Sequence, residues 1–280
     1  MFLYEPVPGF FLQDDPNVSF PDIGAVPPRF GLLDASDARW TTFLARLTQL
    51  NESATDGALY KLLFLGRHGQ AYHNLAELKY GTIAWDAYWS KLNGDDEFVW
   101  GPDAALTNLG NKQARDARAV WKTELAFRAP MPQKAYCSPL TRAIQTHRIV
   151  YSAPTPTALV IENLREYYGE HTCDKRRTRS ELVADFPEID IESGFTEEDE
   201  LWTEVRETEE SRRARANDVL ERVFRESESG DAQVIAITAH GGIIEEVVRI
   251  VGRKWYTSLK GLPTGGILPI VVKAIPVIKT

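Results

Sequence analysis

The stretch Lys61-Leu-Leu-Phe-Leu-Gly-Arg-His-Gly-Gln70 decides how the chain is interpreted, because a short apolar run stops abruptly at an Arg and a His. The apolar run predicts a buried strand that delivers Arg67 and His68 at its carboxyl end. Glycines on both sides of this pair allow the backbone to turn tightly. A guanidinium group clamps an anion through its planar fork of donors, and a neighbouring imidazole can attack that anion. The stretch therefore predicts an anion site with a candidate nucleophile.

The composition limits the partners of the chain. Its 280 residues are 43% hydrophobic and 26% charged, and its formal net charge is −8. This negative charge opposes binding to a nucleic-acid backbone, and no apolar run reaches the length that spans a bilayer. We therefore expect neither nucleic acid nor a membrane as a partner, and any anionic substrate must be held by a local concentration of Arg and His. The sequence indicates no oligomeric state.

The expected location is the cytoplasm, with the nucleus as an open alternative. The first residues, Met1-Phe-Leu-Tyr-Glu-Pro, lack both the basic start and the apolar core of a secretory leader. Cys137 and Cys173 are the two cysteines of the chain, and two cysteines do not make a disulfide framework. Both observations favour a reducing compartment.

The organisation along the chain predicts one domain over residues 1–280. Residues 1–60 form an N-terminal arm, rich in Pro and Phe and expected to pack on the domain, followed by a helix. Segments 72–105 and 167–200 are insertions expected over the active site, and the aromatic side chains of the first either roof a pocket or seal the insertion against the domain. A long charged helix is predicted over 203–228.

Strands and helices alternate, which predicts an α/β fold with three layers, a doubly wound and mostly parallel sheet with helices on both faces. The ligand crevice of such a sheet lies beyond the carboxyl ends of its strands. Polar side chains follow four of the predicted strands, namely Arg67 with His68, Ser138 with Arg142 one turn later, Glu166, and His240. We therefore expect these residues to converge on one crevice.

This set of residues suits the transfer of a phosphoryl group from a phosphate monoester. Arg67 and Arg142 neutralise the phosphoryl oxygens, and their charge persists at any working pH. His68 is the candidate nucleophile, and His240 donates a hydrogen bond to a phosphoryl oxygen, assisted by the amino end of the helix that begins at Gly241. Glu166 protonates the leaving oxygen and later activates water. The scheme needs no metal and no cofactor.

The sequence also resembles the histidine phosphatases, the phosphoglycerate mutase-like superfamily. The family pattern Leu-x-Arg-His-Gly is matched by residues 65–69, Leu-Thr-x-x-Gly-x-x-Gln-Ala by 106–114, Ser-Pro-Leu-x-Arg-Ala-x-x-Thr by 138–146, and the late His-Gly by 240–241. The resemblance implies that His68 is phosphorylated, that Glu166 is the proton donor, and that the phosphate is held by Arg67, Arg142 and His240. It adds Gln70, Asn74 and Gly241 to the substrate or phosphate site.

Within this family the sequence favours a phosphatase over a cofactor-dependent mutase. Mutases carry a basic residue directly after the motif Asn and an Arg directly after the acid, whereas Leu75 and Tyr167 stand at these positions here. Residues 171–177 resemble fungal members labelled phosphomutases on similarity alone. The alternatives that stay open are a phosphoglycerate-type mutase and a non-catalytic scaffold that keeps the phosphatase fold.

The remaining histidines and the basic cluster have simpler interpretations. We predict surface or packing positions for His73 and His147. His171 and Cys173 are spaced like a pair of metal ligands, but no second pair at ligand spacing accompanies them. The basic cluster is interpreted as a solvated face or a partner for the acidic stretch that follows, with a secondary grip on the substrate as the alternative; its members are Lys175, Arg176, Arg177 and Arg179.

Overall fold

The structure is a computed structural model that describes residues 1–151, 157–226, 232–252 and 261–277. Within these ranges the backbone forms a seven-stranded sheet in the order β1-β7-β2-β6-β3-β4-β5. The strands are β1 (Phe2–Pro6), β2 (Leu59–Arg67), β3 (Lys134–Cys137), β4 (Ala158–Val160), β5 (Asp190–Ile191), β6 (Val234–Ala239) and β7 (Ile267–Pro276).

The sheet is mostly parallel, as the sequence predicts. The five strands β2, β6, β3, β4 and β5 run parallel to one another. Strand β7 is antiparallel to both β2 and β1. The N-terminal arm packs on the sheet, and it does so as a strand: Phe2 lies opposite Pro276 at the start of the β1–β7 ladder. The sequence predicted an extended arm there and not an edge strand, because a short segment pairs through its backbone whatever its side chains are.

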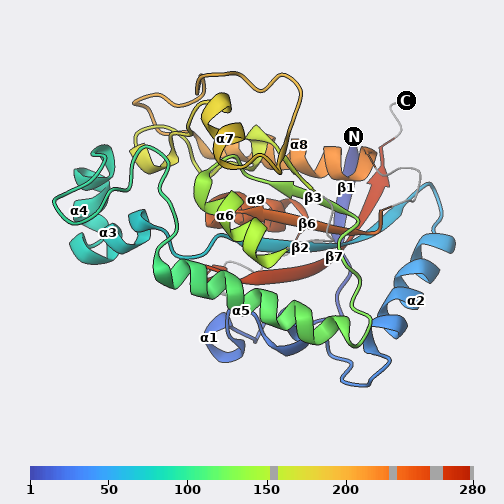
Figure 1. Ribbon diagram of the computed structural model, residues 1–280. Coiled ribbons are helices and arrows are strands. Elements are labelled where there is room, and N and C mark those ends of the chain that lie inside the picture. The colour runs from blue at the N-terminus through green and yellow to red at the C-terminus, as the bar shows by residue number, and fades with distance from the viewer. Residues whose placement is uncertain (152–156, 227–231, 253–260, 278–280) are drawn as a thin grey trace.

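Helices cover both faces of the sheet (Figure 1). They include α1 (Phe20–Ile23), α2 (Arg39–Glu52), α3 (Tyr72–Tyr80), α4 (Thr82–Ala87), α5 (Asn108–Leu125), α6 (Thr141–Val150), α7 (Arg179–Asp185), α8 (Glu209–Arg225) and α9 (Gly241–Ile250). Alternate residues of β2 point to opposite faces, so that Leu63 and Leu65 pack with α8 and α9, whereas Leu62 and Phe64 pack with α2, α5 and α6. The predicted three-layer α/β fold is therefore confirmed.

Threonine side chains cap the starts of α5, α7 and α8. The Thr107 side chain accepts the N–H of Gly110 at the start of α5. The predicted helix over 203–228 is wrong at its start, because Thr208 caps α8 and the chain before it is not helical; residues 227 and 228 lie outside the described ranges. None of the helices in those ranges has the length and apolarity to cross a bilayer.

The two insertions contact each other through a small apolar cluster beside the sheet. Trp85 and Trp100 of the first insertion are buried and share this cluster with Cys173 of the second. Tyr80 and Trp89 stack with their ring centroids 3.8 Å apart. The aromatic side chains of residues 72–105 thus seal the insertion, one of the two roles that the sequence left open. Helix α7 and the short strand β5 lie in the second insertion.

Candidate active site

The backbone at His68 is held on both sides by neighbouring elements. His68 follows β2, and its N–H donates to the carbonyl oxygen of Ala239 (3.0 Å), where β6 ends. Its own carbonyl oxygen accepts the N–H of Gly265 (2.9 Å). The side chain is buried, with 2% exposed. The strand end therefore presents His68 in a fixed position, as the sequence predicts.

The His68 imidazole is held in one tautomer. Its Nδ1 lies 2.7 Å from the carbonyl oxygen of Gly69, and because that oxygen can only accept, Nδ1 carries the proton. Burial, followed by the charges of Arg142 and Arg67, lowers the pKa of His68 well below its usual 6.5. The ring is therefore neutral near neutral pH, and the lone pair of Nε2 is available for nucleophilic attack.

The two predicted arginines lie close enough to His68 to lower its pKa together. Arg67 donates through Nη1 to the carbonyl oxygen of Leu262 (2.8 Å). Arg142 is fully buried on the first turn of α6 and donates through Nη1 to the Cys173 carbonyl oxygen (2.8 Å) and through Nη2 to Asp174 Oδ1 (2.7 Å). Backbone and side-chain acceptors thus fix both guanidinium groups beside a neutral imidazole.

His240 lies beside His68. Its ring centroid is 5.0 Å from that of His68, its Nε2 is 2.7 Å from Ser138 Oγ, and its Nδ1 is buried without a hydrogen-bond partner among the described residues. It is the residue before α9, whose amino end at Gly241 approaches Arg67: a Cβ on Gly241 would stand 3.4 Å from Cζ of Arg67. Ends of β2, β3 and β6 therefore meet here.

Glu166 joins the site through the amino end of α9. Its Oε2 accepts the N–H of Gly242 at 3.0 Å. Burial, and then the negative charge of Asp174, raises the pKa of Glu166 above its usual 4.5, against the opposing effects of Gly242, Arg67 and Arg142. A carboxyl group with a raised pKa retains its proton to higher pH, which suits a proton donor.

Gln70 and Asn74 make hydrogen bonds to the framework of the site. The Gln70 N–H donates to Gln113 Oε1 (2.7 Å), and the Gln70 side chain accepts the Thr107 hydroxyl (2.8 Å). The Asn74 Oδ1 accepts the N–H of Ala71 (3.1 Å) at the start of α3. A Cβ on Gly110 would stand 2.0 Å from the Gln70 carbonyl oxygen, so the Thr-x-x-Gly-x-x-Gln pattern docks α5 against the loop after His68.

His73 is the residue whose position the sequence did not anticipate. Its ring centroid is 5.6 Å from that of His68, and its Nδ1 is buried without a hydrogen-bond partner in the part of the chain that the structure describes. Burial, and then the charge of Arg142, lowers its pKa well below 6.5. The feature of the sequence that could have placed His73 in the site is its position on the first turn of the helix that follows His68. His147, by contrast, is a packing residue as predicted, with its Nδ1 2.9 Å from Thr238 Oγ1.

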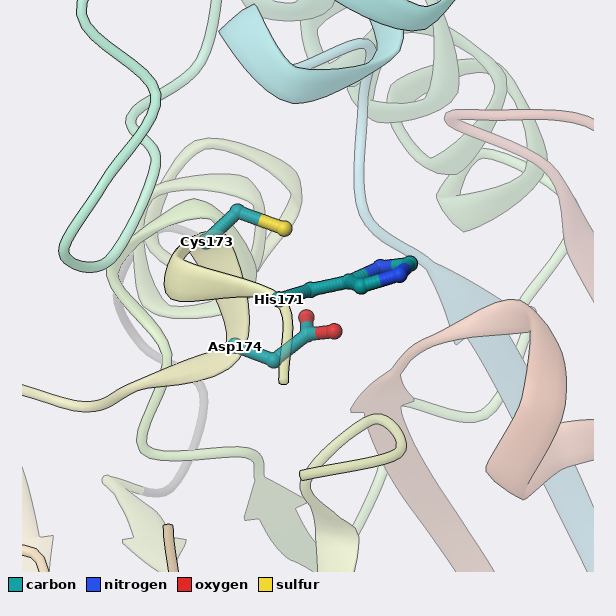
Figure 2. Close-up of side chains that lie close together, drawn as sticks. All are labelled: His171, Cys173 and Asp174. Atoms are coloured by element: carbon teal, nitrogen blue, oxygen red, sulfur yellow. The ribbon is translucent and has the colours of Figure 1, made fainter. Parts of the chain in front are cut away.

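His171, Cys173 and Asp174 gather their side chains in one place (Figure 2). Each offers one ligand atom, and these atoms lie within 4.8 Å of one another. Asp174, however, uses Oδ1 for Arg142 and Oδ2 for Arg206. A carboxylate held by two arginines is a poor metal ligand, and the two cations disfavour a third positive charge nearby. The residues therefore do not fit a metal site.

The basic cluster of the second insertion serves mainly as an internal partner. Arg176 is buried, pairs with Glu162, and donates to the carbonyl oxygens of residues 196–198. Arg177 pairs with Asp185 at 2.6 Å. Lys175 and Arg179 are exposed. The side chain of Arg176 thus contacts the acidic stretch through main-chain carbonyl oxygens, whereas its carboxylate partner, Glu162, lies outside that stretch.

The chain is similar to several known proteins. The family model for the histidine phosphatase superfamily (branch 1) matches residues 63–257. A probable phosphoglycerate mutase of Arthroderma benhamiae is 38% identical, over 96% of this chain and 84% of that protein. Phosphomutase-like protein 3 of Candida albicans is 34% identical, over 94% and 78%. The solved structure of a mycobacterial glucosyl-3-phosphoglycerate phosphatase aligns over 76% of this chain and 90% of that chain, with 20% identity and a TM-score of 0.45.

Proposed function

The chain belongs to the histidine phosphatase superfamily, and on that premise we propose that it hydrolyses a small organic phosphate monoester through a phosphohistidine at His68. Arg67, Arg142 and His240 hold the phosphoryl group. Glu166 gives its proton to the leaving oxygen and then removes a proton from the water that attacks the phosphohistidine. Each step uses side chains of this chain alone.

The observation that carries the proposal is the state of the His68 ring. The hydrogen bond from Nδ1 to the Gly69 carbonyl oxygen (2.7 Å) leaves Nε2 unprotonated in the neutral ring. The burial and the two arginines that lower the pKa of His68 keep the ring in this state. A buried histidine with a merely structural role has no need of two cations beside it. The same two cations offset the negative charge that an incoming phosphate brings.

An open cavity of about 460 Å³ is the proposed place for a small leaving group. It is lined by Asp86, Tyr167, Glu170, His171, Arg206 and Glu207. None of the proposed catalytic residues lines it, and Tyr167, the residue after the proposed acid, links it to the site along the chain. Pockets of this volume accommodate small organic molecules.

The fungal relatives are named as mutases, which supports the mutase alternative. The residues around this cavity nevertheless favour hydrolysis. A mutase must grip a second anionic group of its substrate. Arg206, the arginine that lines the cavity, is already paired with Asp174 (3.0 Å) and with the carbonyl oxygens of Tyr167 and Gly169. Tyr167 itself lies under the guanidinium group of Arg212, 3.7 Å from Cζ to the ring centroid. These engaged cations offer a weak hold on a second anion.

Two measurements test the proposal. Wild-type protein should release inorganic phosphate from at least one member of a panel of sugar phosphates, nucleotides, phosphoglycerates and inositol phosphates, and His68→Ala should release none. Rapid acid-free quenching should trap a phosphorylated His68 by mass spectrometry. His147→Gln, which alters a buried histidine outside the site, is the matched control and should retain turnover. Interconversion of the phosphoglycerate isomers without net hydrolysis would support the mutase. No turnover across the panel would support the scaffold.

A further inference from the structure

The phosphate-site arginine Arg142 is oriented by the second insertion. Both of its terminal nitrogens donate to this insertion, Nη1 to the carbonyl oxygen of Cys173 and Nη2 to the carboxylate of Asp174. Its third nitrogen, Nε, is buried and has no hydrogen-bond partner among the described residues. A buried N–H without a partner is costly unless a ligand accepts it. The guanidinium group is therefore held from one side and has a donor left for an anion.

Asp174 is in turn held by a second arginine. Its Oδ2 accepts Nη1 of Arg206 at 3.0 Å, while its Oδ1 accepts Arg142 at 2.7 Å. Arg206 lies in the non-helical segment before α8 and also donates to the carbonyl oxygens of Tyr167 and Gly169. The buried carboxylate of Asp174 thus links Arg142, in the crevice of the sheet, to the segment around Asp174 and to the segment that holds Arg206. Together Asp174, Arg142 and Arg206 carry a net positive charge.

We propose that Asp174 is a positioning residue of the phosphoryl-transfer site, which fixes the guanidinium group of Arg142 in the orientation that binds the phosphate. This inference rests on the proposed function of Arg142. Figure 2 shows the Asp174 carboxylate beside His171 and Cys173. Each of its two oxygens accepts a hydrogen bond from an arginine. What resembles a metal cluster is on this view the anchor of the phosphate site.

A purely structural ion pair between α2 and α5 provides the comparison. Glu124 is buried and accepts hydrogen bonds from Nε (2.8 Å) and Nη2 (3.2 Å) of Arg39. Glu124 lies in the last turn of α5, whereas Gly110, which contacts the loop after His68, lies in the first. Glu124→Gln therefore removes a buried carboxylate that two arginine nitrogens contact, without the proposed positioning effect.

Asp174 also has a second effect that a structural role would not predict. After burial, its negative charge is the next contribution that raises the pKa of Glu166; the Gly242 N–H, Arg67 and Arg142 lower it. Removing the charge with Asp174→Asn should lower the pKa of Glu166. Because Glu166 must be protonated to act as the acid, the alkaline limb of the pH profile should then move to lower pH.

The experiment measures binding of inorganic phosphate by calorimetry, which needs no turnover, together with the pH profile of kcat/KM for an alkyl phosphate. For Asp174→Asn we expect phosphate affinity to fall by about tenfold or more, as for a lost charge-assisted hydrogen bond. We expect the alkaline limb to move to lower pH. Arg206→Gln, at a side chain that is 28% exposed, should weaken phosphate binding by a few-fold and fold normally. Glu124→Gln should change neither readout.

The outcomes separate this inference from the proposed function. If the wild type binds phosphate but hydrolyses no ester, the function fails while the binding comparison still tests Asp174. Unchanged phosphate affinity in Asp174→Asn and in Arg206→Gln would overturn the positioning role. Tighter phosphate binding in either variant would also overturn it, because Asp174 would then compete with the phosphate for Arg142. If Asp174→Asn does not fold, Arg206→Gln alone decides.

Discussion

Gly242 lies directly against the carboxyl group of Glu166. The Gly242 N–H donates to Oε2 at 3.0 Å, and a Cβ at this position would stand 2.3 Å from Oε1 and 2.3 Å from Cε2 of Tyr167. Such distances are shorter than van der Waals contact. The first turn of α9 therefore does two things at once: it carries His240 at its start and fixes the proposed acid through the next residues.

This contact predicts that Gly242→Ala displaces Glu166. A displacement on the order of 1 Å can lower activity about 100-fold, so we expect a loss of that size in kcat/KM for an alkyl phosphate. Gly241→Ala is the comparison, because its Cβ would stand 3.4 Å from Cζ of Arg67, close to an ordinary van der Waals distance, and should cost far less. Steady-state kinetics measure both variants, and circular dichroism confirms that they fold. Equal losses in the two variants would show that the Glu166 contact is not the cause.

A second prediction separates the role of Glu166 from general binding. Glu166→Gln keeps the shape of the side chain and removes its proton, so kcat/KM for an alkyl phosphate should fall by about 10²–10⁴. A nitrophenyl phosphate should lose much less, because nitrophenolate leaves without protonation. The ratio of the two kcat/KM values in wild type and variant is the measurement. The same loss for both esters would remove Glu166 from the role of acid.

The pH dependence follows from the two shifted groups. His68 must be neutral to attack, and its pKa is lowered well below 6.5 by burial, Arg142 and Arg67, so activity should fall only in clearly acidic buffer. Glu166 must be protonated, and burial and Asp174 raise its pKa above 4.5. Activity should therefore fall as the pH rises through this raised pKa. We expect a bell-shaped profile of kcat/KM for an alkyl phosphate, with its maximum in mildly acidic to neutral buffer. In Glu166→Gln the alkaline limb should disappear, and a flat wild-type profile would contradict both roles.

The sequence predicted the parts of this site that follow from local pattern. Arg67 with His68 and His240 each come directly after an apolar run, and parallel strands bring their carboxyl ends to one edge of a sheet. Glu166 follows the predicted third strand after a short turn, and the structure brings its carboxyl group to the same crevice through Gly242. No side-chain contact had to be known for these expectations.

Two of the parts that the sequence missed depend on contacts between distant segments. Asp174 is one acid among many in a charged insertion, and only packing of that insertion against α6 brings it to Arg142. The arm at Phe2 became a strand because the free edge of β7 was available to it. The third miss is local: Arg206 was assigned to a helix, because charged residues at helical spacing do not reveal that the Thr208 hydroxyl caps α8 by accepting the N–H of Ser211.

His73 carries a prediction of its own, since its unpartnered Nδ1 is buried and its ring lies beside that of His68. A phosphate oxygen can accept a hydrogen bond from this ring. The leaving group can donate a hydrogen bond to it or accept one from it. His73→Phe should therefore lower kcat/KM by about tenfold, the size of one lost hydrogen bond to a charged group, while the fold is kept. Kinetics with an aryl and an alkyl phosphate measure it. Wild-type kinetics in the variant would return His73 to the packing role that the sequence predicted.

The buried histidines also predict how stability depends on pH. Burial lowers the pKa of His147 to about 4, and those of His68, His73 and His240 are lowered too, so these rings stay neutral in the folded chain. Below pH 6.5 the unfolded chain binds protons that the folded chain excludes. The free energy of unfolding should therefore fall with falling pH, by about 1.4 kcal/mol per pH unit for each such histidine. Glu166 has a raised pKa and therefore has the opposite effect on the free energy of unfolding. This effect involves at most one proton, and only at pH values near the pKa of Glu166.

His147→Gln tests this linkage outside the proposed site. Its side chain can still bond to Thr238 Oγ1, where the His147 Nδ1 lies at 2.9 Å in the wild type, but it cannot take up a proton. Urea unfolding measured from pH 7 to about pH 5 should show a slope shallower by about 1.4 kcal/mol per pH unit in the variant, because one excluded proton is gone. The two proteins should differ in slope mainly below pH 6.5, the usual pKa of an unfolded histidine. Parallel curves for the wild type and the variant would mean that His147 is protonated to the same extent in the folded and unfolded chain.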